Sequence, residues 1–258
     1  MSDKNDSLGN RIKTYENCSR FYLQRRTPVI LRIDGKSFHT VTRNCKRPFD
    51  PVLNNAMVTS AMLTAEVMQG FKLAYHQSDE VTFFLSDWDT FETSAWFDNN
   101  LAKLITITAS TFGAYFNDNY PKYREDEHSS KYFNENSEDT PPFKYEDGLA
   151  FFDCRAFNVP KEEVANTFLW RSHDWKRNSV QMLGRSVFSQ KQMHGKNVDQ
   201  IKAMLLEKGV DHNDVEDKFQ NGTFIVKEGS GLKVLTNVKA VYSEIAALVD
   251  PFLYPKKD

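Results

Sequence analysis

Short apolar runs rich in β-branched and aromatic residues alternate along the chain with longer segments of helical spacing. Val29–Asp34 predicts a strand, and Phe71–Leu85 predicts a hairpin with a polar turn at His76–Glu80. Helices are predicted where apolar residues recur every three or four positions. Their ranges are Asp6–Glu16, Val52–Gln69, Ser94–Phe116, Glu162–Trp170, Asn178–Phe188 and Val198–Lys208.

The pattern is interrupted once and then resumes. Residues 118–147 are rich in acidic and small polar residues, which predicts a long surface loop. Strands are then predicted at Gly148–Phe157, Thr223–Lys227 and Lys233–Thr236, followed by a polar tail. Strands separated by long helices, with one clear hairpin, predict an α+β fold with helices on one face of the sheet.

Composition is that of an ordinary globular protein. The chain has 258 residues, 40% of them apolar and 26% charged, and a formal net charge of -2. Any contact with RNA therefore requires a local basic patch. Three cysteines without metal-ligand spacing predict no disulfide framework. Because no apolar run could span a bilayer and no secretory segment opens the sequence, we expect a cytoplasmic protein without membrane contact.

Three acidic residues are the main candidates for chemistry. Asp34 ends a predicted strand and precedes Gly35, while Asp79 and Glu80 lie in the hairpin turn. Carboxylates brought together in this way repel each other unless a cation compensates. Mg²⁺ typically binds one or two carboxylates and completes its shell with water and phosphates, and two such ions can serve phosphoryl displacement. The alternative is ordinary turn chemistry, in which Asp-Gly and Ser-Asp are common.

Basic and hydroxyl residues near these acids could contact phosphates. Lys36–His39 bring backbone amides and a cation directly beyond Gly35, as a phosphate-binding turn requires. Arg47, Lys103 and Ser110 become candidate triphosphate contacts if a two-metal site exists. Otherwise they are solvated charges and an interior hydroxyl.

A basic and aromatic cluster stands out in the second half of the chain. Trp170-Arg171 is followed closely by Lys176-Arg177-Asn178. Aromatic stacking combined with cations that contact the backbone is a common way of binding single-stranded RNA. A helix start with a solvated basic flank explains the same residues equally well.

Two motifs carry a family resemblance. Arg32–His39 (RIDGKSFH) and Tyr75–Glu80 (YHQSDE), about forty positions apart, resemble the paired motifs of the tRNA-His guanylyltransferase superfamily. The similarity extends to Leu8–Glu16, Phe152–Phe157 and the Trp-Arg pair, so it covers most of the chain. It implies a polymerase- and cyclase-like palm domain, an antiparallel sheet with helices packed on one face, and usually a homotetramer.

The resemblance also implies a division of the chain and roles for its residues. Residues 1–147 would form the catalytic domain, and residues 148–258 a largely helical part that returns strands to the sheet and contacts RNA. Catalysis falls to Asp34, Asp79 and Glu80, and two Mg²⁺ ions to Asp34, Gly35 and Asp79, with ATP or GTP as substrates. The implied nucleotide contacts are Asp34, Gly35, Lys36, Ser37, Phe38, His39, Arg47, Ser78, Asp79, Lys103 and Ser110. The candidate RNA contacts are Arg171, Lys176, Arg177 and Asn178.

One departure from the family pattern bears on the substrate. Family members that guanylate tRNA-His carry His-Ile-Asn-Asn shortly after the Trp-Arg pair, where this chain reads Lys176-Arg177-Asn178-Ser179. The chain resembles instead the subgroup that repairs 5′-truncated tRNAs. We therefore predict template-dependent 3′-to-5′ nucleotide addition to the 5′ end of tRNA, after NTP activation of its 5′-monophosphate. The alternatives are guanylation of tRNA-His, a nucleotidyl cyclase, and a non-catalytic RNA-binding palm protein.

Overall fold

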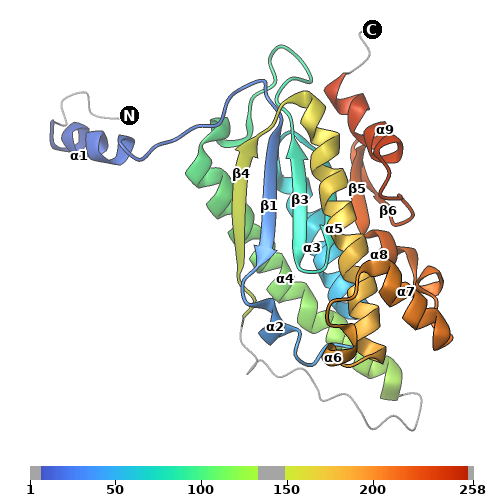
Figure 1. Cartoon of the computed structure of the whole chain (residues 1–258). Coiled ribbons are helices and arrows are strands. Elements are labelled where there is room, and N and C mark those ends of the chain that lie inside the picture. The colour runs from blue at the N-terminus through green and yellow to red at the C-terminus, as the bar shows by residue number, and fades with distance from the viewer. Residues whose placement is uncertain (1–6, 133–148, 255–258) are drawn as a thin grey trace.

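Alternation of inward and outward side chains builds one antiparallel sheet in the computed structural model, which describes residues 7–132 and 149–254 (Figure 1). The order of the described strands is β4-β1-β3-β2-β5-β6. Their bounds are β1 Val29–Gly35, β2 Phe71–Gln77, β3 Glu80–Leu85, β4 Phe152–Asn158, β5 Thr223–Glu228 and β6 Gly231–Leu235. The sheet thus combines the predicted hairpin with strands from the second half of the chain.

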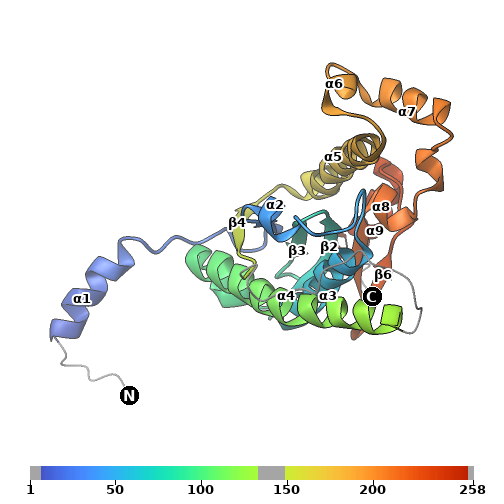
Figure 2. The ribbon, with the colours of Figure 1, turned by 90° about the horizontal axis from the view of Figure 1, so that it is seen from below.

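One face of the sheet is covered by α3 (Pro51–Val67) and α4 (Leu101–Tyr132) (Figure 2). Alternate residues of β1, such as Leu31 and Ile33, are fully buried in this core. Helix α3 begins where it does because the Asp50 carboxylate accepts hydrogen bonds from the first backbone amides of the helix.

The C-terminal part adds helices on the opposite face. Helices α5 (Lys161–Val187) and α9 (Tyr242–Leu253) enclose a second core with Ile30 and Phe84, and α7 (Val198–Glu207) packs against the far half of α5. Helix α1 lies apart from the sheet and has no buried residue (Figure 1). None of the described helices is long and apolar enough to cross a membrane. The remaining helices are α1 Ser7–Asn17, α2 Phe38–Val41, η1 Trp96–Asn99, α6 Gln190–Met193, η3 His212–Asp214 and α8 Asp217–Asn221.

The largest differences from the predicted boundaries lie in three segments, and β4 also begins later than predicted, at Phe152. The helix predicted over residues 94–116 begins as η1, restarts at Leu101 and continues to Tyr132, so the first half of the predicted loop 118–147 is helical. Residues 133–147 of that loop lie outside the described residues. The two helices predicted on either side of Lys176 are one helix, α5, and the predicted polar tail contains α9.

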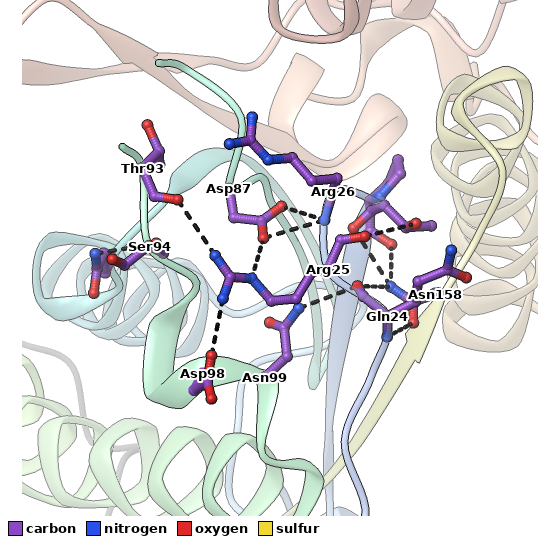
Figure 3. A network of polar contacts seen from close by, with 12 residues as sticks. Gln24, Arg25, Arg26, Asp87, Thr93, Ser94, Asp98, Asn99 and Asn158 are labelled. Carbon is purple, nitrogen blue, oxygen red and sulfur yellow. Dashed lines mark hydrogen bonds and ion pairs between the residues drawn. The ribbon is translucent and has the colours of Figure 1, made fainter. Parts of the chain in front are cut away.

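A polar network fixes the start of β1, at the end of the strand opposite Asp34 (Figure 3). Arg25 Nε donates to Asp87 Oδ2 at 2.7 Å, and its Nη1 lies 2.9 Å from Asp98 Oδ1. Asn158 of β4 accepts from the backbone N–H of Gln24 at 2.8 Å. The segment before β1 is thereby joined to β4, to the loop after β3 and to the entrance of α4.

Candidate active site

Strand pairing brings the predicted acids Asp34, Asp79 and Glu80 to one end of neighbouring strands, which we call the acidic edge. Asp34 of β1 lies opposite Glu80 of β3 and, on its other side, opposite Asp153 of β4. The backbone N–H of Gly35 donates to the carbonyl oxygen of Asp79 at 3.1 Å, which joins the hairpin turn to the end of β1. Asp153 was not among the predicted site residues, because its proximity depends on a pairing between strands far apart in the sequence.

The carboxylates of Asp34 and Asp79 repel each other. Burial and, secondarily, the Asp34 carboxylate raise the pKa of Asp79. Within the described residues neither aspartate forms an ion pair, and no cluster of three or more acidic, histidine or cysteine side chains could hold a metal alone. Two carboxylates and the carbonyl of Gly35 are hard oxygen donors, and they leave room for water and substrate phosphates around Mg²⁺.

His76 holds the hairpin turn and was missed by sequence reasoning. Its Nε2 lies 3.0 Å from the carbonyl oxygen of Ser78, the residue whose left-handed backbone (φ 52°) forms the turn. Because a carbonyl can only accept, Nε2 carries a proton. Burial lowers the pKa of His76 to about 4, so the ring is neutral at physiological pH. His76 therefore positions the Ser78–Asp79 turn.

Replacing His76 by Gln is expected to reduce the loss of folding stability that occurs as the pH falls from 7 to 4. As pH falls from about 6.5 to about 4, the unfolded chain binds a proton on His76 that the folded chain excludes, so wild-type stability decreases. Thermal unfolding from pH 7 to 4 should show a smaller loss of Tm in the variant. His194→Gln, on an exposed histidine, is the control. Parallel pH profiles for wild type and His76→Gln would contradict the assignment.

The turn after Asp34 is shaped by a buried ring. Phe38 is buried and packs against Phe116 and Phe152, with ring centroids 5.6 and 5.3 Å apart. A Cβ added to Gly35 would lie 2.4 Å from Cδ2 of Phe38. Glycine therefore permits the chain to fold back over this ring. Lys36, Ser37 and His39 are exposed around it, whereas only the backbone of Phe38 remains available to a nucleotide.

Gly35→Ala is expected to destabilise the protein by about 1–3 kcal/mol, since the new methyl group must displace the Phe38 ring. The shifted turn should also reduce activity beyond the loss of folded protein. Denaturant unfolding and single-turnover assays measure the two effects. Gly231→Ala is the matched control, because the nearest atom to its added Cβ lies at 3.8 Å. Equal unfolding free energies for the two variants would argue against this role of Gly35.

The structure does not bring all of the predicted phosphate-contacting residues close to the acids. Lys103 lies near the start of α4, where Leu101 pairs with Phe21 ahead of β1, about a strand length from Gly35. Its Nζ is 5.9 Å from the ring centroid of Phe97. Ser110 lies farther along the helix and is exposed, as is Arg47 in the segment before α3. Of the predicted phosphate contacts, those of Lys36–His39 directly follow Asp34 and Gly35 in the chain and lie beside the acidic edge.

Glu80 is engaged by Arg171 of α5 in a bidentate ion pair. Arg171 Nε lies 2.6 Å from Oε1 and its Nη2 lies 2.8 Å from Oε2, and both residues are only 8% exposed. Arg32 Nε is 3.9 Å from Oε2. Burial raises the pKa of Glu80, and Arg171 opposes this shift. Arg171, predicted as an RNA contact, thus faces the acidic edge inside the protein.

The segment that departs from the family pattern is partly committed to internal contacts. Asp174 binds Arg171 and Arg177, and it accepts from Asn178 Nδ2 at 3.4 Å. Ser179 is buried and donates to the carbonyl of Phe219 at 2.6 Å, which joins α5 to α8. Lys176 and Arg177 are exposed. These two are the cations of the predicted RNA-binding set that solvent reaches.

A small hollow adjoins the hairpin turn. It lies between the turn, the start of α3, α5 and α8. Its lining combines aromatic and polar side chains, among them Phe49, Asp50, Ser78, Trp175 and Phe219.

Comparison with known proteins identifies the family of this chain. The profile of the tRNAHis guanylyltransferase family matches residues 9–160. The structure of a bacterial tRNA(His) guanylyltransferase (Thg1)-like protein in complex with ATP superposes with a TM-score of 0.83 and 34% identity, covering 97% of this chain and 100% of that one. Its counterpart in complex with GTP gives a TM-score of 0.76 and 32% identity, covering 96% and 100%.

Sequence relatives extend the same likeness. The probable tRNA(His) guanylyltransferase of Mus musculus is 25% identical over 212 residues, which are 77% of this chain and 64% of that protein. The matched family profile spans more than half of the present chain and includes Asp34, Asp79 and β4. This chain therefore belongs to the tRNA-His guanylyltransferase family of nucleotidyltransferases.

Proposed function

We propose that this protein adds nucleotides to the 5′ end of truncated tRNA in the 3′-to-5′ direction, guided by the opposite strand of the acceptor stem. The observation that carries the proposal is the Asp34–Asp79 pair: the N–H of Gly35 donates to the carbonyl of Asp79, and neither carboxylate forms an ion pair within the described residues. The structural likeness to proteins bound to ATP and to GTP supports nucleoside triphosphates as substrates.

The donor set fits divalent metal ions. Asp34, Asp79 and the carbonyl of Gly35 would hold two Mg²⁺ ions, which supply charge stabilisation at the reacting phosphates. The chain's own residues perform the remaining tasks. Lys36 and the amides of the following turn face the triphosphate, while His76 and the Glu80–Arg171 pair keep the hairpin turn in position. No general base is required, since positioning and electrostatics dominate phosphoryl transfer.

The reaction has two displacements. In the first, the 5′-monophosphate of the tRNA attacks the α-phosphorus of ATP or GTP and releases pyrophosphate. In the second, the 3′-hydroxyl of the incoming nucleotide attacks the activated 5′ phosphorus and releases the nucleoside monophosphate. Both proceed by in-line attack at a phosphorus atom, so one acidic edge can serve both.

Repair is preferred to guanylation of tRNA-His because of the segment Lys176–Ser179. Ser179 is buried in a contact with Phe219, and Asn178 donates to Asp174, so neither side chain is presented freely to RNA. Recognition of one particular tRNA through this segment would have to rely on Lys176 and Arg177 alone.

The test is Mg²⁺-dependent incorporation of labelled nucleotide into four RNAs: tRNA-His and another tRNA, each complete and lacking its first nucleotide. We expect extension of both truncated tRNAs, with the added base complementary to the opposite strand. Extension of tRNA-His alone would establish guanylation in place of repair. Failure on all four RNAs, with cyclic nucleotide formed from ATP or GTP, would establish a cyclase.

A further inference from the structure

The sheet has an open face beside the acidic edge. Along β4, Cys154 and Ala156 pack against the core under α4, whereas Asp153 and Arg155 point the other way and are exposed. In Figure 1, helix α5 passes over the sheet between β3 and β5 and leaves β1 and β4 in view. Ile30, near the start of β1, is buried in the core formed with α5 and α9. We define the open face as the surface around Arg32, Asp34, Asp153 and Arg155, between Ile30 and the acidic edge.

Two pairs of a cation with an aromatic ring flank the acids on the open face. Arg32, opposite Arg155 in the β1–β4 register, lies 5.4 Å from the ring centroid of Trp170, which is 55% exposed. Beyond the acids, Lys36 donates its backbone N–H to Phe151, and its Nζ lies 6.0 Å from that ring, which is 60% exposed. Four residues along a strand separate the pairs by roughly 13 Å.

Exposed aromatic rings are not by themselves unusual. Phe91, for example, is 87% exposed and has Arg26 at 5.6 Å, but it belongs to the loop after β3 at the opposite end of β1. Trp170 and Phe151 differ because their contacts with Arg32 and Lys36 place them on either side of Asp34. Their position beside the reacting edge, rather than their exposure alone, points to a ligand.

The side chains of the open face suit the binding of one end of an RNA strand. A ring with a neighbouring cation offers a stacking surface for a base, which single-stranded RNA provides at its unpaired positions. Arg155, whose side chain is 56% exposed, forms a long ion pair with Asp153 at 4.0 Å and is accessible as a donor for a phosphate. Acids between the two pairs disfavour phosphates except where metal ions neutralise them.

We propose that the 5′ end of the RNA lies on the open face, with its terminal base stacked on Trp170 and a backbone phosphate bound by Arg155. This inference rests on the proposed function and specifies the surface that binds its RNA substrate. Arg171 helps to position the Trp170 ring. Its guanidinium lies 4.5 Å from the centroid of that ring and also forms the ion pair with Glu80. The stacking platform is thereby fixed relative to the acidic edge.

The probe is an acceptor-stem RNA hairpin lacking its first 5′ nucleotide, titrated in Mg²⁺ without nucleotide so that no reaction occurs. Trp170→Leu should weaken binding about ten-fold, whereas Trp170→Phe, which keeps a ring, should weaken it less than about three-fold. Arg155→Gln should lower the dependence of log K on log salt by about one unit. Phe91→Leu is the control and should leave the affinity unchanged.

Fluorescence gives an independent readout. The other tryptophans are less exposed than Trp170, so RNA binding should quench wild-type emission by stacking. This quench should be lost in Trp170→Phe although that variant still binds. Unchanged affinity for Trp170→Leu, or a quench that persists in Trp170→Phe, would overturn the proposal.

Nucleotide incorporation by the wild type separates this proposal from the proposed function. If the wild type extends truncated tRNA while Trp170→Leu binds the hairpin normally, the open face is wrong and the function stands. If Trp170-dependent binding is found but no nucleotide is incorporated, the surface stands and the function is wrong. Binding of Mg-ATP should be equal in wild type and Trp170→Leu, which shows that the nucleotide site is intact.

Discussion

Replacing Asp79 by Asn is expected to lower kcat for nucleotide addition by about three orders of magnitude. The substitution keeps the shape of the side chain and removes a charge that Asp34 cannot replace, because each aspartate supplies separate oxygen donors. The hydrogen bond from the N–H of Gly35 to the carbonyl of Asp79 involves only backbone atoms and should persist in the variant. Single-turnover incorporation with saturating tRNA and Mg-NTP measures the loss without interference from product release.

The same variant should be more stable than wild type when metal is removed. Burial and Asp34 raise the pKa of Asp79, so the folded chain holds this proton more tightly than the unfolded chain does. Wild-type stability in EDTA therefore decreases as pH rises from the ordinary aspartate pKa through the raised folded value, and the lost stability is still absent at neutral pH. Asn carries no charge at any of these pH values, so Tm in EDTA should rise.

The effect of Mg²⁺ on Tm also distinguishes the wild type from Asp79→Asn. An ion that binds only the folded protein raises Tm, so Mg²⁺ should stabilise the wild type and have little effect on Asp79→Asn. Asp153→Asn is the matched control, since that acid lies at the same edge but its side chain is 59% exposed. If Asp153→Asn lost as much activity as Asp79→Asn while the latter kept its response to Mg²⁺, the metal site would belong to β1 and β4 instead.

The acids could be predicted from sequence because strand ends and hairpin turns are local features. Asp34 follows an apolar run, and Asp79 interrupts two such runs, so their convergence required only that the strands pair. The ion-pair partner of Glu80 could not be predicted from the sequence in this way. Arg171 is 91 residues away, and its basic neighbours made it resemble an RNA contact. Nothing local distinguishes an arginine that will be buried from one that solvent will reach.

Composition concealed other features. The helix α4 continues past residue 117 because Tyr120 is buried and Arg124 forms a buried ion pair with Asp50, although the sequence there is polar and contains Pro121. Phe38 lies within a motif that implies nucleotide contact, yet its apolar ring belongs to the core. Both cases depend on tertiary packing, which overrides the local pattern.

Arg171→Met is expected to destabilise the protein by about 3–5 kcal/mol, because it leaves Glu80 buried without its bidentate partner. Arg171→Lys should lose less, since it keeps the positive charge but cannot donate along two parallel bonds. The double variant Arg171→Met with Glu80→Gln should recover much of the lost stability, because no unpaired charge remains. Denaturant unfolding of the three variants in EDTA measures these differences without a contribution from bound metal.

Activity of the double variant then separates stability from positioning. Glu80 directly follows Asp79, and Arg171 connects this residue to α5, so the ion pair fixes the hairpin turn relative to the helix that carries Trp170. If this positioning matters, the double variant should be stable and bind Mg-ATP while its kcat stays at least about ten-fold below wild type. Arg171→Lys should retain more activity than the double variant. Wild-type kcat in the stable double variant would show that the pair serves only to neutralise a buried charge.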